Sequence, residues 1–292
     1  MNADSKATWI LVGTTMLAGL GWIFSKETVQ GLPPFGFVGL RFLVASICLL
    51  PFCYQSLSLF TARQLLQAIG AGSILSAALL AWIHAITVSD TLGEGAFIVS
   101  LSMIIVPIIA WVIFKERPIR AFWISMPIAV SGLALLSLQD VWQASSGQVW
   151  FLANACLLAL HFNVNSRLVQ KLPVLTLTCV QLFSTGAIAL LVSLCVETIP
   201  TSVDIHIWWW FAASALLATS IRYVMQTAGQ KHCNPASAAL IMLLEPIWTV
   251  ILSILWYGEQ LSLNKLLGCG LILFSLVFYR TGGRLSSLFT SK

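Results

Sequence analysis

Residues 234–259 read NPASAALIMLLEPIWTVILSILWYGE, an apolar run whose only charge before its last residue is Glu245. A helix needs about 20 apolar residues to cross the hydrocarbon core of a bilayer, so this run is long enough for one crossing. Glu245 would lie about 16 Å along the helix axis, near the middle of the membrane. Pro246 cannot donate to the carbonyl of Met242, so the pattern predicts a kink and a free backbone acceptor beside the carboxylate.

The rest of the chain has the same character. Of its 292 residues, 59% are hydrophobic and only 9% are charged, and the mean hydropathy is +0.93. Soluble domains carry about 25% charged residues. This composition excludes a soluble globular enzyme, a disordered protein and a nucleic-acid binder, and it makes the lipid bilayer the expected surroundings.

The cysteines give no sign of a metal site. The seven of them are scattered, without a CxxC pair or Cys/His metal spacing, so neither a disulfide framework nor a bound metal is expected. There is also no glycine-rich loop of the kind that holds phosphates, so direct use of ATP is not supported and no cofactor is expected.

Ten apolar runs separated by turn residues predict an all-α polytopic membrane protein with ten transmembrane helices. The runs are continuously apolar, which favours helices over the alternating strands of a membrane barrel. The expected spans are 8–29, 34–54, 64–88, 92–115, 119–138, 148–168, 173–196, 206–229, 234–256 and 262–280.

Lysine and arginine indicate the orientation of these spans. The N-terminus, the loops after even-numbered spans and the short basic tail from Thr281 share one side. That side holds Lys6, Arg63, Lys115, Arg117, Arg120, Arg167, Lys171, Lys231, Arg280, Arg284 and Lys292. The other side holds only Lys26 and Lys265, so both termini are expected to be cytoplasmic.

The two halves of the chain resemble each other. Gln30-Gly-Leu-Pro33 recurs as Gln170-Lys-Leu-Pro173, and Phe114-Lys-Glu-Arg recurs as Tyr257-Gly-Glu-Gln. The pattern predicts two five-helix repeats, residues 1–145 and 146–292. Because five is odd, the second repeat would enter the membrane from the opposite face, and such inverted repeats are typical of secondary transporters.

Three longer stretches carry a resemblance to a known family. They are Ala18-Gly-Leu-Gly-Trp22 through Ala45, Ala96 through Pro118, and Pro235 through Leu261. In order and spacing these stretches resemble the EamA-type repeats of the drug/metabolite transporter superfamily. The resemblance implies ten helices, a central cavity lined mainly by helices 1, 3, 4, 6, 8 and 9, and export of small metabolites, often amino acids.

Ionisable side chains at membrane depth are costly unless they are paired or hydrated, so each needs a reason. Glu245 suits a substrate ammonium group or a proton, and the alternative is a structural carboxylate tied to a neighbouring helix. Arg222 lies as far before the turn near residues 233–234 as Glu245 lies after it, so the two would share a depth. Arg222 could brace Glu245, release it when substrate arrives, or meet a substrate carboxylate.

Other polar and aromatic residues are candidates for the cavity wall. His84 and His161 occupy spans that the resemblance assigns to the cavity, and a histidine could relay protons. Asn163 and Asn165 make the sixth span polar over more than one turn. Two aromatic candidates, Trp22 on the first span and Trp248 one turn after Glu245, would supply apolar wall. Ordinary packing is the alternative for each of these residues.

Four charged residues at span ends and one near an end are expected to be structural. Arg41 lies seven residues into the second span and can satisfy helix-end carbonyls or extend toward the surface. Lys26 and Glu27 could pair with it or guard an entrance. Glu116 and Glu259 are repeat-related and are expected to cap the next helix.

The combined interpretation is a secondary transporter, not an enzyme. It would export an amino acid or related small molecule across the bacterial inner membrane by alternating access, with proton coupling left open. The alternatives are an importer of a cationic or nucleotide-like metabolite and an intramembrane lipid-modifying enzyme. The expected partners are the substrate and the lipid bilayer, with no nucleic acid. A monomer would suffice because it holds both repeats, although a dimer is compatible with the sequence.

Overall fold

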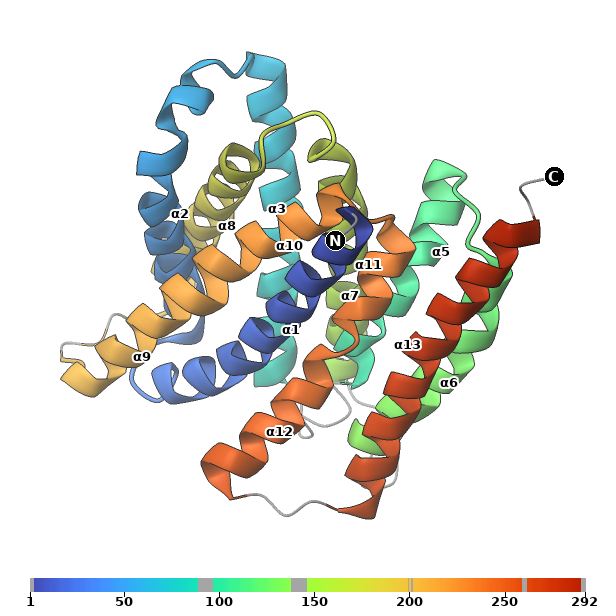
Figure 1. Ribbon diagram of the computed structural model, residues 1–292. Helices are drawn as coiled ribbons and strands as arrows, with labels where there is room; N and C mark the ends of the chain where they lie inside the picture. Colours follow the sequence, from blue (N-terminus) through green and yellow to red (C-terminus); the bar gives the residue numbers. More distant parts are fainter. Residues whose placement is uncertain are drawn as a thin grey trace.

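The computed structural model describes residues 3–88, 97–137, 146–198, 200, 202–258 and 262–289, and every regular element among them is helical (Figure 1). The first half holds α1 (Ala3–Thr28), α2 (Pro34–Ser58), α3 (Ala62–Thr87), α5 (Ser102–Phe114) and α6 (Arg120–Ser137). The second half holds α7 (Ser146–Leu168), α8 (Val174–Val196), α9 (Ile205–Ala215), the π-helical turn η1 (Leu216–Ile221), α10 (Arg222–Lys231), α11 (Pro235–Met242), α12 (Glu245–Tyr257) and α13 (Leu263–Phe289).

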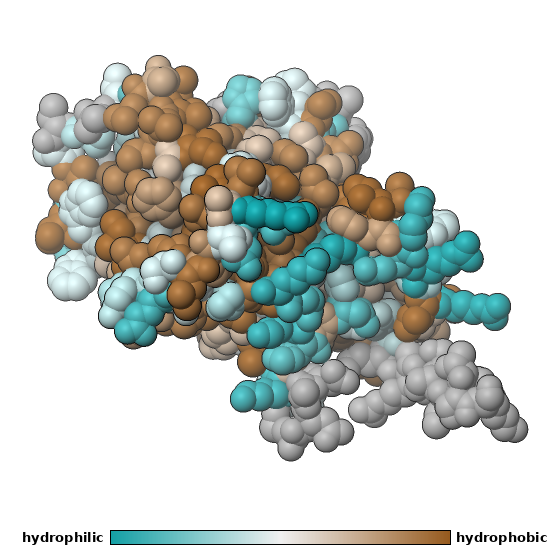
Figure 2. Space-filling model, turned by 90° about the horizontal axis from the view of Figure 1, so that it is seen from above, coloured by the Kyte–Doolittle hydropathy of each residue, from teal (hydrophilic) through white to brown (hydrophobic). Residues whose placement is uncertain are grey.

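The described helices form a multi-pass membrane protein. Seven helical stretches are long and apolar enough to cross a bilayer: Ser5–Thr28, Pro34–Ser58, Ala62–Ala85, Phe97–Phe114, Ser146–Leu168, Val174–Val196 and Pro235–Tyr257. Large apolar side chains such as Trp209 and Leu255 are 72% and 77% exposed, which suits contact with lipid. Figure 2 views one end of the bundle and shows hydrophilic side chains gathered over a largely hydrophobic body.

Each of the ten expected spans contains a helix, although residues 92–96 and 138 lie outside the described part. The span 234–256 is broken at Leu243 and Leu244, beside the kink that the sequence predicts at Pro246. Two details differ from the sequence prediction. The span 206–229 is interrupted by η1. The helix α13 continues to Phe289, where the sequence predicts a short tail from Thr281.

The two halves repeat local backbone features at corresponding positions. Pro33 precedes α2 with φ −59° and ψ 138°, and Pro173 precedes α8 with φ −60° and ψ 135°. Lys115 follows α5 and Gly258 follows α12, and both have left-handed backbone, with φ of 63° and 66°. A fixed φ of about −65° makes proline a natural helix start, while the left-handed residue ends a helix by satisfying its last carbonyls.

The packing of the helices follows the same repeat. The helix α2 packs on its counterpart α8, and α6 packs on its counterpart α13. The contact of α3 with α7 is matched by the contact of α10 with α1, and the contact of α5 with α7 by that of α12 with α1. This exchange of equivalent contacts is the arrangement of two inverted five-helix repeats around a pseudo-two-fold axis.

Glycines allow α2 and α8 to cross closely. A Cβ added to Gly39 would lie 2.7 Å from the backbone nitrogen of Leu190, and one added to Gly186 would lie 2.6 Å from that of Leu43. Small residues at such crossings let membrane helices pack backbone to backbone. Glu197, after the end of α8, also accepts hydrogen bonds from the first turn of α2, so the pair forms one rigid wall.

Candidate functional site

The break between α11 and α12 places a carboxylate at membrane depth. Leu243 and Leu244 donate to the carbonyls three residues before them, which tightens the chain at the end of α11. Pro246 has no N–H to donate to the carbonyl of Met242, so the helix cannot continue unbroken. Glu245 therefore begins α12, where the partial positive charge of a helix N-terminus favours a carboxylate.

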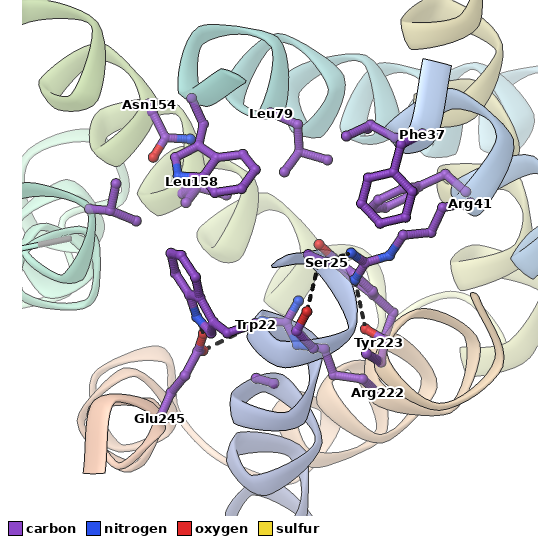
Figure 3. Close-up of a pocket in the computed structure, with 17 residues that line it drawn as sticks. Trp22, Ser25, Phe37, Arg41, Leu79, Asn154, Leu158, Arg222, Tyr223 and Glu245 are labelled. Carbon is purple, nitrogen blue, oxygen red and sulfur yellow. Dashed lines mark hydrogen bonds and ion pairs between the residues drawn. The ribbon is translucent and has the colours of Figure 1, made fainter. Parts of the chain in front are cut away.

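A cavity of about 340 Å³ lies beside this break, where the two repeats meet. A smaller compartment of about 140 Å³, drawn in Figure 3, shares part of its wall. The residues that line both are Trp22, Leu79, Val99, Leu158, Arg222, Tyr223 and Glu245. The wall therefore comes from the first, third, fourth, sixth, eighth and ninth expected spans, which are α1, α3, residues 97–114, α7, η1 with α10, and α11 with α12. Further lining residues come from α2 and α6, and the mixture of apolar and polar groups suits a small molecule.

Three residues that the sequence singles out meet at this shared wall. The indole Nε1 of Trp22 donates to Oε1 of Glu245 at 3.2 Å, and Nη2 of Arg222 lies 3.7 Å from Oε2 of the same carboxylate. The side chains of Arg222 and Glu245 remain 18% and 24% exposed. The pair is thus a loose ion pair that faces the cavity, because 3.7 Å is beyond normal hydrogen-bond distance.

Arg41 reaches the smaller compartment from α2. Its Nη1 donates to Ser25 at 3.0 Å, its Nη2 donates to the carbonyl of Ala218 at 3.2 Å, and its Nε donates to Thr219. The last two acceptors belong to η1, and such π-helical turns are frequent at functional sites. The sequence predicts a structural role for Arg41 near the outer surface, and the structure additionally places it in the wall of a central compartment.

A buried chain of hydrogen bonds lies behind the larger cavity. His161 is 3% exposed and lines that cavity, and its Nε2 lies 3.1 Å from Oε1 of Gln181 on α8. The Nε2 of Gln181 donates to Asn165 at 2.9 Å, and Asn165 donates in turn to Thr227 and Gln230 on α10. These bonds hold α7, α8 and α10 in one arrangement around His161.

Asn163 ties α7 to α5 instead of facing the cavity. Its amide donates to the carbonyl of Val106 at 2.9 Å. One turn later, Arg167 lies 2.7 Å from Glu116 and stacks over the ring of Phe114. Glu116 therefore binds an arginine of the other repeat, whereas the sequence predicts that it caps the next helix.

The comparison with known proteins agrees with this two-repeat arrangement. The sequence model of the EamA-like transporter family matches residues 5–138 and again residues 145–281. The chain belongs to the EamA-like transporter family. A drug/metabolite transporter superfamily member of this kind is a membrane transporter, and family membership points to a transporter rather than an enzyme.

Two relatives illustrate how far this EamA-like transporter resembles other proteins. It is 26% identical over 141 residues to the uncharacterized transporter YcbK of Bacillus subtilis strain 168, a match that spans 46% of this chain and 45% of that protein, so less than half of the relative is covered. A solved crystal structure superposes with a TM-score of 0.84 over 96% of this chain and 99% of the other, at 16% identity. That likeness shows the fold.

Two further candidate residues, Trp248 and His84, lie away from the cavities of this EamA-like transporter. The backbone and Cβ of Trp248 lie close to Gly19 of α1, so the residue packs between α12 and α1 and is absent from the described lining of both compartments. His84 is exposed, and its ring meets the edge of Trp150 on α7. Glu259 lies outside the described residues.

The cavity also uses residues that the sequence analysis did not select. Tyr223 follows Arg222 and lines both compartments, and Gln226 lines the larger one. Gln181 supports His161 from behind. A signal existed for two of them, because Gln181 interrupts an otherwise apolar span and Gln226 follows Arg222 by four residues, on the same helix face.

Proposed function

We propose that this EamA-like transporter exports an amino acid or a related small metabolite by alternating access. The observation that carries the proposal is the Trp22–Glu245–Arg222 cluster, which lies at the junction of the two repeats and beside a broken helix. Transporters with inverted repeats bind their substrates at such junctions, near the middle of the membrane. Trp22 of the first repeat and Arg222 of the second both contact the carboxylate of Glu245. Relative movement of the two repeats would therefore change the contacts of a substrate bound there.

Glu245 is the group that would hold a substrate ammonium. Its ion pair with Arg222 is loose, and a quarter of its side chain is exposed to the cavity. An arriving ammonium would bind Oε2 of Glu245 in place of Arg222. Trp22 would keep the carboxylate oriented through its hydrogen bond to Oε1. Tyr223 and Leu79 would supply the apolar wall that excludes water from this exchange.

His161 is the second substrate-facing group in the proposal. It lies in the wall of the larger cavity, and Gln181 fixes its ring. Asn165 then acts through Gln181, as a positioning residue behind the wall. The substrate would meet one side of a pre-arranged histidine, which is the arrangement that gives orientation at low entropic cost.

The proposal includes the membrane in which the protein lies and its orientation there. Both termini would be cytoplasmic and the membrane would be the bacterial inner membrane, because lysine and arginine concentrate on the side of the N-terminus. Figure 1 supports this orientation, with the N-terminus and the α2–α3 connection toward one end, and the last turn of α12 and the first turn of α13 at the other. A single chain would be the working unit, since both repeats contribute to one cavity.

Counterflow in proteoliposomes tests the proposal. Vesicles with the purified protein are loaded with a pool of unlabelled amino acids, amines and nucleosides, and entry of each labelled compound is compared with entry into protein-free vesicles. Accelerated entry of one amino acid supports the proposal. If the folded protein exchanges no amino acid, that assignment is wrong and nucleotide-like or lipid-like substrates become the better candidates. Repeating the assay with an imposed pH gradient tests for coupling to protons.

A further inference from the structure

The smaller compartment contains more positive charge than the described protein groups around it neutralise. Its charged lining residues are Arg41, Arg222 and Glu245, so two guanidinium groups share one carboxylate. Figure 3 shows Arg41 on one side of this pocket, with Trp22 and Glu245 on the other. A charge held at membrane depth needs a partner or water, because the surrounding medium has a low dielectric constant.

Arg41 is held in place by neutral oxygens and by the faces of Phe37 and Phe42, whose ring centroids lie 5.5 and 5.8 Å from its guanidinium carbon. Its bonds go to the hydroxyls of Ser25 and Thr219 and to the carbonyl of Ala218, and it takes part in no ion pair with the described residues. A guanidinium has five N–H donors, and three are used here. The positioned side chain therefore keeps N–H donors, and a positive charge that no carboxylate of the described residues pairs with.

Arg222 is still less satisfied. Its contact with Glu245, at 3.7 Å, is longer than a hydrogen bond, and its Nε is buried without a partner among the described residues. The Nε itself is out of reach of a ligand, but the side chain is 18% exposed and lines the compartment, so its accessible donors can meet a ligand oxygen. The second arginine of the compartment is thus available for an acceptor that approaches from the cavity.

We propose that Arg41 and Arg222 form a subsite for a carboxylate of the substrate in the smaller compartment. The inference rests on the proposed transport function and refines its substrate class. A carboxylate suits the forked donors of arginine, and the 140 Å³ of space favours a compact group. With Glu245 on the shared wall, the complete site would bind a carboxylate on one side and an ammonium on the other.

Thermal melting of the purified protein in detergent tests the subsite without requiring transport. The probes are acid and amide pairs that differ only at the carboxyl group: phenylalanine with phenylalaninamide, leucine with leucinamide, and phenylpropionate with its amide. Inorganic phosphate is a further probe. At least one acid is expected to bind about tenfold to a hundredfold more tightly than its amide, as charge-assisted hydrogen bonds imply.

Variants locate the effect. Arg222→Gln and Arg41→Lys are each expected to reduce the preference for acid over amide at least about fivefold, because each removes a forked guanidinium. Arg41→Lys is used in place of Arg41→Gln because it retains the positive charge and so guards against a variant that does not fold. Arg63→Gln removes the same charge from an exposed position at the start of α3 and is expected to leave the preference unchanged. The ratio of affinities is the readout, so a general loss of stability does not imitate the result.

Several outcomes overturn the subsite. Equal stabilisation by acids and amides contradicts it, as does the absence of stabilisation by any acid, or an acid preference that both arginine variants retain. Stabilisation by phosphate as strong as that by the acids would assign the arginines to phosphate esters instead. Acid-specific binding without counterflow of any compound would leave the subsite standing and contradict the transport proposal, so the two failures are distinguishable.

Discussion

Phe114 and Tyr257 occupy equivalent positions in the two repeats, and each ring lies beneath a cation from the first helix of the opposite repeat. The guanidinium carbon of Arg167 lies 3.3 Å from the centroid of Phe114, and Nζ of Lys26 lies 4.0 Å from the centroid of Tyr257. Carboxylates reinforce both contacts. The sequence suggests that Lys26 and Glu27 pair with Arg41 or guard an entrance, and the structure places both against Tyr257.

The contact of Arg167 with Phe114 and the contact of Lys26 with Tyr257 lie at opposite ends of the helix bundle. Alternating access would break one contact while the other stays intact. The hydroxyl of Tyr257 donates to Glu27 at 2.7 Å, whereas Arg167 pairs with Glu116 at 2.7 Å. Tyr257→Phe should favour opening at the end away from the N-terminus, and Arg167→Met should favour opening at the N-terminal end. Tyr257→Phe removes one hydrogen bond, which predicts a shift of about fivefold in the equilibrium. Arg167→Met removes the ion pair with Glu116, the stack over Phe114 and two bonds to Asn163, so its shift should be larger than that of Tyr257→Phe.

The measurement is labelling by an impermeant maleimide in vesicles of known orientation. A single cysteine at Ser100, a half-buried position in the wall of the larger cavity, reports access in a chain whose native cysteines are replaced. The two variants should change the labelling rate in opposite senses for each orientation. Changes in the same sense for both variants would contradict the idea that the contacts control opposite ends.

Glu245→Gln should abolish most of the transport while leaving the fold intact. The amide can still accept from Trp22 but cannot pair with a substrate ammonium, so counterflow should fall at least about tenfold. The variant also leaves Arg222 without its carboxylate, so melting is measured beside counterflow and the rate is expressed per folded molecule.

Glu197→Gln is the matched control for that experiment. This carboxylate accepts from the backbone N–H groups of Phe35 and Gly36 at 2.9 and 2.8 Å, so it stabilises the start of α2 away from the cavity. The variant should melt earlier but keep its counterflow rate per folded molecule. Unimpaired counterflow by Glu245→Gln under the same conditions would exclude Glu245 from substrate binding.

The left-handed residues after α5 and α12 predict opposite effects of two substitutions. Lys115 has a φ of 63° and therefore strains its Cβ, so Lys115→Gly should raise the free energy of unfolding by about 1 kcal/mol. Gly258 has a φ of 66° with no atom near an added Cβ, so Gly258→Ala should lower it by a similar amount through the backbone alone. Equal melting temperatures for both variants and the parent protein would refute this account.

The spans and the repeat could be predicted because their causes are visible in the sequence. Bilayer thickness sets the length of each apolar run, and proline and left-handed residues mark helix ends at repeat-related positions. The common depth of Arg222 and Glu245 also followed from their equal distances to one turn, and the two side chains lie 3.7 Å apart. Depth along a helix is a matter of counting residues.

Which way a side chain faces was harder to predict, because it depends on the rotation of each helix and on its neighbours. His161 and Asn165 are one turn apart, yet one lines the cavity while the other meets α10. His84 faces outward against Trp150. The residues Leu216–Ile221 carry no local signal of the π-helical turn that Arg41 contacts. The turn is accompanied by contacts with α2, and such contacts are not visible in the sequence of the turn itself.

Gln181 offers a test of the buried polar chain behind the cavity. Its two amide atoms join His161 to Asn165, and Gln181→Leu would leave both groups buried without that partner. Each unsatisfied buried group costs about 1–3 kcal/mol, so the variant should lose about 2–4 kcal/mol of stability. Gln226→Leu is the matched control, because Gln226 is also buried and lines the cavity but carries no hydrogen bond to the described residues. Its stability should fall by clearly less than that of Gln181→Leu. Denaturant titration in detergent measures both values.

Equal losses of stability for the two variants would mean that the chain of hydrogen bonds contributes nothing beyond the burial of polar atoms. His161 would then lack the fixed orientation on which its proposed role in substrate binding depends.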